Sequence, residues 1–135
     1  MKNYDAVIVG GSYAGLSCAR SAAARGLDTL VLERKRNLGE KIRTTGIFVG
    51  EAAKVLQVPG PLKRDIHGVR LYAPNGKSID LASPGYQFQA INTPELMRWM
   101  GKRAQLNGVE IRMDSNVTAV QEMENCVRFP KQGVS

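Results

Sequence analysis

The residues with the clearest chemical potential form one short glycine-rich stretch near the start of the chain, Gly10-Gly11-Ser12-Tyr13-Ala14-Gly15. It stands between an apolar tetrapeptide at residues 6–9 and an alanine-rich segment. A dinucleotide-binding turn has the pattern G-x-G-x-x-G between a strand and a helix, with an acidic residue about twenty positions further on. Glu33 supplies that acidic residue at the end of the next apolar run. The spacing therefore predicts a site for the ADP moiety of a dinucleotide.

Each position of this motif has a physical purpose. Gly10 allows a tight turn out of the strand, and Gly15 lets the helix lie close against the sheet. Amides at the helix N-terminus attract the pyrophosphate, and Glu33 can accept hydrogen bonds from the ribose hydroxyls. Ser12 replaces the middle glycine of the pattern. Its small side chain can donate to a phosphate oxygen, at some cost in fit.

The elements that must position these residues follow from the apolar pattern. Residues 5–9 and 29–32 are predicted to be buried strands, and residues 14–25 a helix that ends at Gly26. Strand, turn, helix and strand in this order make a βαβ unit, in which the two strands are parallel. The residues after Gly15 add to the pattern, because Ala19 is small where the helix crosses close to the strand.

The rest of the chain is less regular. Residues 69–72 and 78–81 alternate apolar and polar side chains around Pro74-Asn75-Gly76, which predicts a β-hairpin. Thr93 is predicted to cap a helix that closes at Asn107-Gly108, and further short strands are predicted at residues 109–112 and 117–120.

Composition limits the classes of function. The chain has 135 residues, 43% of them hydrophobic, and a formal net charge of +7. No apolar run is long enough to span a membrane and no signal peptide is evident, so we expect a cytoplasmic protein. The basic cluster after residue 33 lacks interleaved aromatic side chains, which disfavours nucleic acid as a partner. The two cysteines match no metal or redox motif, and His67 reads as structural, so we expect no metal site and no catalytic residue.

The segments at residues 5–15 and 32–34 resemble the FAD-dependent oxidoreductases of the geranylgeranyl-reductase and aromatic-hydroxylase superfamily, and residues 38–46 and 93–111 add to this resemblance. It implies an α/β, Rossmann-like FAD/NAD(P)-binding fold with an inserted β-hairpin. It also implies an isoprenoid or aromatic substrate in full-length relatives and FAD as cofactor, with NAD(P)H as a possible reductant. The implied cofactor-binding residues are Gly10, Gly11, Ser12, Tyr13, Ala14, Gly15, Glu33, Arg34, Arg43 and Val117.

The resemblance assigns roles to the residues outside the turn. Arg34 would lie near the adenine, Arg43 would contact a phosphate, and the backbone of Val117 would touch the adenine. Relatives are several times longer, and their second flavin motif and substrate domain lie downstream. We therefore expect residues 1–135 to be the N-terminal portion of one FAD/NAD(P)-binding domain that is inactive alone. With the first strand at an open sheet edge, self-association through that edge is expected.

Two alternatives remain open from the residues alone. The first is an NAD(P)-binding Rossmann domain, because Glu33 suits NAD while Arg34 and Arg36 could meet a 2′-phosphate. The hairpin between the second strand and the next helix favours FAD, since a simple NAD domain would continue directly with further βαβ units. The second alternative is a non-catalytic remnant of a flavoprotein that keeps only the fold.

Overall fold

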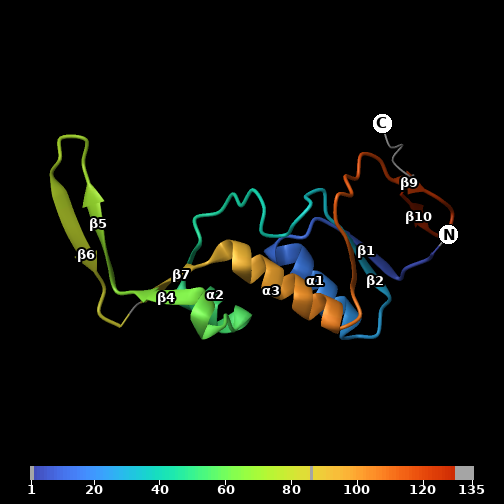
Figure 1. Ribbon diagram of the computed structural model, residues 1–135, viewed down its shortest axis with the longest axis horizontal. Helices are drawn as coiled ribbons and strands as arrows, with labels where there is room; N and C mark the ends of the chain where they lie inside the picture. Colours follow the sequence, from blue (N-terminus) through green and yellow to red (C-terminus); the bar gives the residue numbers. More distant parts are fainter. Residues whose placement is uncertain (1, 86, 130–135) are drawn as a thin grey trace. The chain divides into compact units, whose positions relative to one another are not determined.

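The computed structural model describes residues 2–85 and 87–129, which divide into two compact units (Figure 1). The first unit contains the chain up to Glu40 and resumes at Met97, and the second unit is Lys41–Leu96. The glycine-rich turn and Glu33 both belong to the first unit.

A three-stranded parallel sheet in the order β1-β2-β8 forms the frame of the first unit. Its strands are β1 (Ala6–Val9), β2 (Thr29–Leu32) and β8 (Glu110–Arg112). The central strand β2 is buried along its whole length, as expected for a strand paired on both sides. Along its other edge, β1 pairs with no strand among the described residues. The predicted βαβ unit with parallel strands is confirmed.

Two helices supply the core on one face of this sheet. Helix α1 (Tyr13–Ala23) connects β1 to β2, and α3 (Thr93–Leu106) precedes β8 (Figure 1). Ala19 of α1 and Ala104 of α3 are both fully buried against Val31. Small side chains at this contact let the helices approach the strand closely. The glycine after α1, Gly26, has a φ of +83°, the left-handed conformation predicted for a residue that ends a helix.

Two local predictions are wrong. No strand forms at residues 117–120; β9 (Gln121–Glu122) begins later and pairs with β10 (Val127–Arg128). The turn between them sets this position, because the Met123 amide donates to the carbonyl of Cys126 at 2.8 Å. At the start of α3, Asn92 takes the capping place predicted for Thr93. Its carbonyl accepts the hydrogen bond of the Leu96 amide at 2.9 Å, and Thr93 is the first residue of the helix.

The second unit contains an antiparallel sheet that the sequence did not predict. Its strand order is β3 (Ile47–Phe48), β7 (Phe88–Ile91) and β4 (Lys63–Ile66). The short helices α2 (Gly50–Leu56) and η1 (Gly60–Leu62) lie between β3 and β4 in the chain. Phe48, Ala53 and Ile91 are buried in this unit.

The predicted hairpin is also part of the second unit and is confirmed. Strands β5 (Gly68–Tyr72) and β6 (Ser78–Ala82) pair in antiparallel register, and all their residues are exposed. Within the described part of the chain, no helix has the length and apolar character needed to cross a membrane.

Candidate functional site

The glycine-rich turn lies where β1 ends and α1 begins. Gly10 adopts a φ of +103°, which a side chain would strain, and its amide donates to the carbonyl of Leu32 at 2.8 Å. This hydrogen bond continues the pairing of β1 with β2 by one step beyond Val9. The turn is therefore fixed to the carboxyl end of both strands.

Gly15 has no room for a side chain. A Cβ atom built there would overlap the carbonyl oxygen of Gly10 and would also contact the side chain of Ile8 at 3.5 Å. Since the first obstacle is backbone, it cannot be avoided by a rotamer change. The structure thus gives Gly15 the purpose that the motif predicted: it lets α1 start directly against the end of β1.

No acidic side chain of the first turn opposes an anion at the N-terminus of α1. The side chain of the N-cap residue Ser12 makes no capping hydrogen bond. Ser12 is exposed. Unpaired amides at a helix start carry a partial positive charge, so this position attracts negatively charged groups. Tyr13, Ala14 and Gly15 form the beginning of the helix.

Glu33 is the buried acid of the site. It is 6% exposed and directly follows β2. Its Oε2 atom accepts a hydrogen bond from the Gly11 amide at 2.6 Å, and its Oε1 atom accepts one from the Lys35 amide at 2.9 Å. The amide of Gly11 therefore serves to hold the carboxylate. A Cβ on Gly11 would lie 2.6 Å from Cδ2 of Leu38 and 3.2 Å from Oε2 of Glu33, so the leucine side chain would have to shift and the carboxylate would be crowded.

The remaining predicted residues lie in three different places. Arg34 follows Glu33 directly, and its side chain is exposed. Val117 is half-buried and belongs to the segment after β8 in the same unit. Arg43 belongs to the second unit, where it is exposed.

A backbone connection between two loops was missed by the sequence analysis. Beyond the last paired residues of β2 and β8, the Glu33 amide donates to the Arg112 carbonyl at 2.9 Å. The Asp114 amide donates to the Lys35 carbonyl at 2.9 Å, and the Ser115 amide donates to the Glu33 carbonyl at 2.8 Å. These bonds join the loop that leads to Val117 to the residues around the buried acid. No short motif signals such a contact, because its members are about 80 positions apart in the chain.

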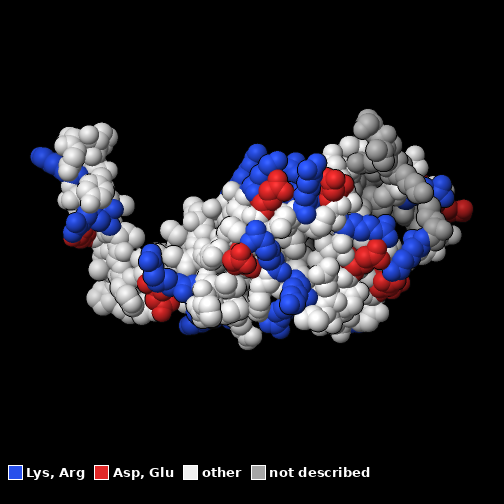
Figure 2. All heavy atoms as spheres, in the orientation of Figure 1, with Lys and Arg blue, Asp and Glu red and all other residues white. Residues whose placement is uncertain are grey.

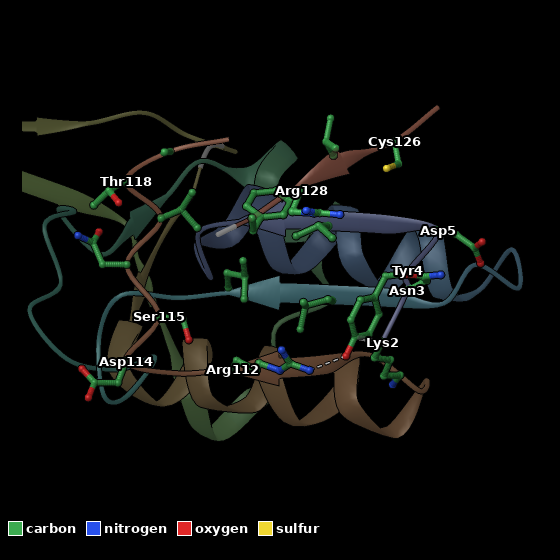
Figure 3. Close-up of a pocket in the computed structure, with 18 of the residues that line it drawn as sticks. Lys2, Asn3, Tyr4, Asp5, Arg112, Asp114, Ser115, Thr118, Cys126 and Arg128 are labelled. Atoms are coloured by element: carbon green, nitrogen blue, oxygen red, sulfur yellow. Dashed lines mark hydrogen bonds between the residues drawn. The ribbon is translucent and has the colours of Figure 1, made fainter. Parts of the chain in front are cut away.

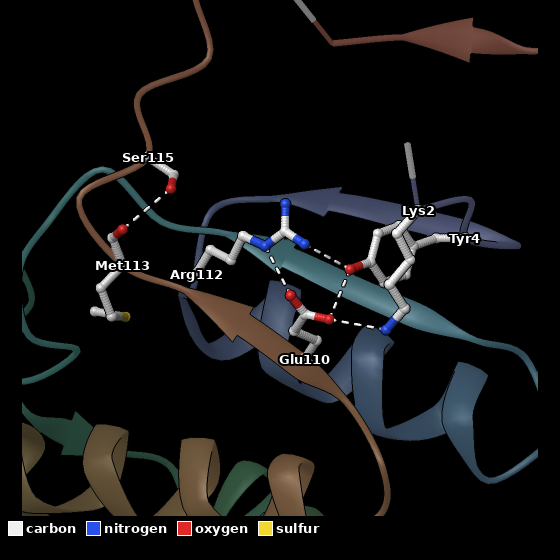
Figure 4. A network of polar contacts seen from close by, with 6 residues as sticks. All are labelled: Lys2, Tyr4, Glu110, Arg112, Met113 and Ser115. Atoms are coloured by element: carbon white, nitrogen blue, oxygen red, sulfur yellow. Dashed lines mark hydrogen bonds and ion pairs between the residues drawn. The ribbon is translucent and has the colours of Figure 1, made fainter. Parts of the chain in front are cut away.

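At the opposite end of the sheet, a polar network ties the N-terminal segment to β8 (Figure 4). The carboxylate of Glu110 accepts hydrogen bonds from Tyr4 at 2.6 Å, Arg112 at 2.7 Å and Lys2 at 2.9 Å. These three donors lower the pKa of Glu110 to about 2, with the Tyr4 hydroxyl contributing most. Arg112 also donates to the Tyr4 oxygen at 2.7 Å. Lys2, Tyr4 and Arg112 of this network also line the cavity that borders this sheet.

The face of the sheet that carries Val7 and Leu30 borders a cavity of about 920 Å³ (Figure 3). Leu32 completes its apolar floor, and residues 114–119 and 125–129 contribute its walls. Neither the glycine-rich turn nor Glu33 lines this cavity. It adjoins the candidate site, because the lining residues Leu32 and Arg112 accept hydrogen bonds from the amides of Gly10 and Glu33.

Charged side chains are mixed on the surface. Figure 2 shows lysine and arginine in several groups on the drawn face, with acidic side chains beside many of them. In residues 2–85 and 87–129, no three histidine, cysteine or acidic side chains are grouped to hold a metal ion, and Cys18 and Cys126 are free and exposed.

Comparison with known families gives one match, to the family described as FAD dependent oxidoreductase, over residues 5–83. Among curated proteins, the chain is 27% identical over 122 residues to a digeranylgeranylglycerophospholipid reductase of Methanosarcina acetivorans. That match covers 87% of this chain and 30% of the relative. A digeranylgeranylglycerophospholipid reductase 2 of Methanopyrus kandleri is 31% identical over 116 residues, covering 82% of this chain and 28% of the relative.

Solved structures share the fold. A geranylgeranyl bacteriochlorophyll reductase-like protein of Thermoplasma acidophilum superposes with a TM-score of 0.78 at 23% identity, covering 92% of this chain and 33% of that one. The halogenase PltM, solved in complex with phloroglucinol and FAD, superposes with a TM-score of 0.73 at 13% identity. The match covers 99% of this chain and 32% of the halogenase chain. The chain thus spans about a third of the length of these relatives.

Proposed function

The chain belongs to the family of FAD-dependent oxidoreductases, and we propose that its first unit binds the ADP moiety of FAD at the carboxyl ends of β1 and β2. The observation that carries this proposal is the joint geometry of the turn and the acid. Because Gly15 has no side chain, α1 can start directly against the end of β1. The Gly11 amide donates to the Glu33 carboxylate and keeps it beside the turn. To bind ADP, this fold uses an anion site at the glycine-rich turn and a hydroxyl acceptor at the end of the next strand. The α1 N-terminus and Glu33 occupy these two places.

The pyrophosphate would lie at the start of α1. The backbone amides at the start of α1, those of Ser12, Tyr13 and Ala14, would donate to its oxygens, and the positive φ of Gly10 would turn the chain away from it. The Ser12 hydroxyl, which makes no capping bond, would add a further donor. This use of the serine would offset part of the fit lost with the motif's middle glycine.

Glu33 would bind the adenosine ribose. An ionised carboxylate offers about four lone-pair positions, and backbone amides occupy two of those on Glu33. The other positions would accept the ribose hydroxyls. Because a buried carboxylate repels a phosphate on the 2′ oxygen, this arrangement favours FAD over the NADP alternative.

The contacts outside the glycine-rich turn and Glu33 are proposed from the family resemblance and from the solvent exposure of the two arginine side chains. Arg34 would lie against the adenine, the backbone of Val117 would contact its edge, and Arg43 would reach a phosphate. The whole of residues 1–135 would then act as part of one FAD/NAD(P)-binding domain.

Bound flavin supplies the redox chemistry in this family, while residues of this chain would bind and orient the cofactor. NAD(P)H would serve as the reductant. An isoprenoid substrate is proposed because matched relatives are named as reductases of digeranylgeranylglycerophospholipid. A cytoplasmic location would give the protein access to NAD(P)H.

Self-association through β1 is a further part of this proposal. Among the described residues β1 is the edge strand of its sheet, and Val9 is 56% exposed although it is apolar. Unpaired backbone groups along such a strand can pair with the same strand of a second copy.

Calorimetric titration with ADP tests the proposed site. Glu33→Ala should weaken ADP binding by about 1–3 kcal/mol, the usual loss for hydrogen bonds to a charged group. Glu33→Gln keeps one oxygen acceptor and should lose less. Glu122→Ala, which removes an exposed carboxylate on β9, should bind ADP normally.

Two results would contradict the proposed site. Equal ADP affinity of the folded Glu33→Ala and Glu122→Ala variants would remove Glu33 from it. Tighter binding of adenosine 2′,5′-bisphosphate than of ADP would favour the NADP alternative.

A further inference from the structure

Asp114 holds an unusual backbone conformation at the edge of the proposed adenosine site. Its φ is +53°, in the left-handed region that residues other than glycine, asparagine and aspartate seldom adopt. Only two other non-glycine residues in the described part of the chain have a positive φ, Lys41 and Gln57, and both belong to the second unit. Asp114 lies two residues after the end of β8.

The left-handed turn is closed from both sides by hydrogen bonds. The Asp114 amide donates to the Lys35 carbonyl at 2.9 Å, and the next amide, that of Ser115, donates to the Glu33 carbonyl at 2.8 Å. The Ser115 hydroxyl donates to the carbonyl of Met113 at 3.0 Å, across the turn (Figure 4). The chain therefore changes direction at Asp114 while it stays bonded to the end of β2.

The same turn is linked to the buried carboxylate. Lys35, whose carbonyl accepts from Asp114, donates its own amide to Oε1 of Glu33 at 2.9 Å. Oε2 of that carboxylate in turn accepts from Gly11 in the glycine-rich turn at 2.6 Å. A displacement at Asp114 would thus reach both the ribose acceptor and, three residues further along the chain, Val117.

We propose that Asp114 is a positioning residue for the adenosine end of the nucleotide site, acting through its left-handed backbone and not through contact with the ligand. This inference rests on the proposed function. The pyrophosphate end depends on the Gly10–Gly15 turn, whereas the adenosine end depends on the direction that the chain takes at Asp114. A change at Asp114 should therefore disturb the adenosine end more than the pyrophosphate end, which it reaches only through the Glu33–Gly11 bond.

The test compares ADP with inorganic pyrophosphate by NMR titration of the isotope-labelled chain, which reports each backbone amide. Asp114→Val places a β-branched residue at the left-handed position and should weaken ADP binding by about tenfold or more. Pyrophosphate binding, read at the amides of Gly10–Gly15, should stay within about twofold of that of the unsubstituted chain. Asp114→Gly, which adopts the left-handed conformation freely, should bind both ligands normally.

A matched control separates positioning from general strain. Gln57→Val introduces the same β-branched residue at a left-handed position (φ +49°) in the second unit. It should lower the melting temperature as Asp114→Val does and leave the ratio of ADP to pyrophosphate affinity unchanged. If Asp114→Val does not fold, Asp114→Ala provides a milder strain for the same comparison with Asp114→Gly.

Hydrogen exchange gives a readout without ligand. In Asp114→Val the amides of residues 114 and 115 should exchange faster, and in Asp114→Gly they should remain protected. An unchanged ADP-to-pyrophosphate ratio in Asp114→Val, or equal losses in the Gly and Val variants, overturns the inference while the proposed function stands. If neither ligand shifts the Gly10–Gly15 amides of the unsubstituted chain, the proposed function itself fails.

Discussion

Replacing Gly15 by alanine is the most direct test of the close contact between α1 and β1. In a helix, alanine is normally more stable than glycine by about 0.5–1 kcal/mol, because glycine loses more backbone freedom on folding. At Gly15 the added Cβ would overlap the carbonyl oxygen of Gly10. Overpacking of this kind typically costs about 1–3 kcal/mol. The expected net result is a loss of stability of about 0–2.5 kcal/mol, where the helix propensity alone would give a gain.

The effect on ligand binding should be larger than the effect on stability. The overlap is relieved only if the start of α1 moves away from the end of β1, and the amides proposed to hold the pyrophosphate move with it. A hydrogen bond to a charged group contributes about 1.5–3 kcal/mol. Since about 1.4 kcal/mol corresponds to a tenfold change, loss of two such bonds would weaken ADP binding by about a hundredfold or more. Gly15→Val should abolish binding.

Urea denaturation followed by circular dichroism measures the stability term, and calorimetric titration with ADP measures the binding term. Gly50→Ala is the matched control, because Gly50 also lies at the start of a helix, its φ is not positive, and a Cβ there meets only the Gln87 carbonyl oxygen at an ordinary 3.6 Å. That variant should keep its stability within a few tenths of a kcal/mol and bind ADP unchanged. A Gly15→Ala variant that is more stable than the unsubstituted chain and binds ADP equally well would refute the contact.

Other changes test separate parts of the structure. Gly11→Ala should weaken ADP binding, because its Cβ would press on Leu38 and on the Glu33 carboxylate; calorimetry against Gly50→Ala checks this. The pKa of Glu110 is lowered to about 2 from an ordinary value of 4.5, so its contribution to stability is present above pH 4.5 and is lost as the pH falls toward 2. Glu110→Gln should therefore flatten the acid side of a stability-against-pH curve. An unchanged slope would refute the network. Val9→Lys should shift any dimer toward monomer by light scattering, because a charged side chain opposes pairing at an exposed edge strand.

The local pattern of residues determined the elements whose hydrogen bonds are made within short stretches. The strand–turn–helix–strand unit, the hairpin of β5 and β6 and the helix after Asn92 follow from apolar periodicity and from the positions of glycine, proline and asparagine. The steric need for Gly10 and Gly15 was also evident, because the motif defines a backbone geometry that only glycine satisfies there. Glu33 was placed correctly at the end of β2 by the length of the apolar run.

Only the tertiary structure decided which distant segments meet. The sheet of β3, β7 and β4 is built from strands of two to four residues, too short to show a period, and each pairs with a segment far away in the chain. The same holds for the carboxylate of Glu33, whose partner is the amide of Gly11, 22 residues earlier. The left-handed turn at Asp114 is held by bonds to Glu33 and Lys35 across two strand ends. Sequence spacing does not indicate the bonds at Asp114, because they form only where β8 pairs with β2.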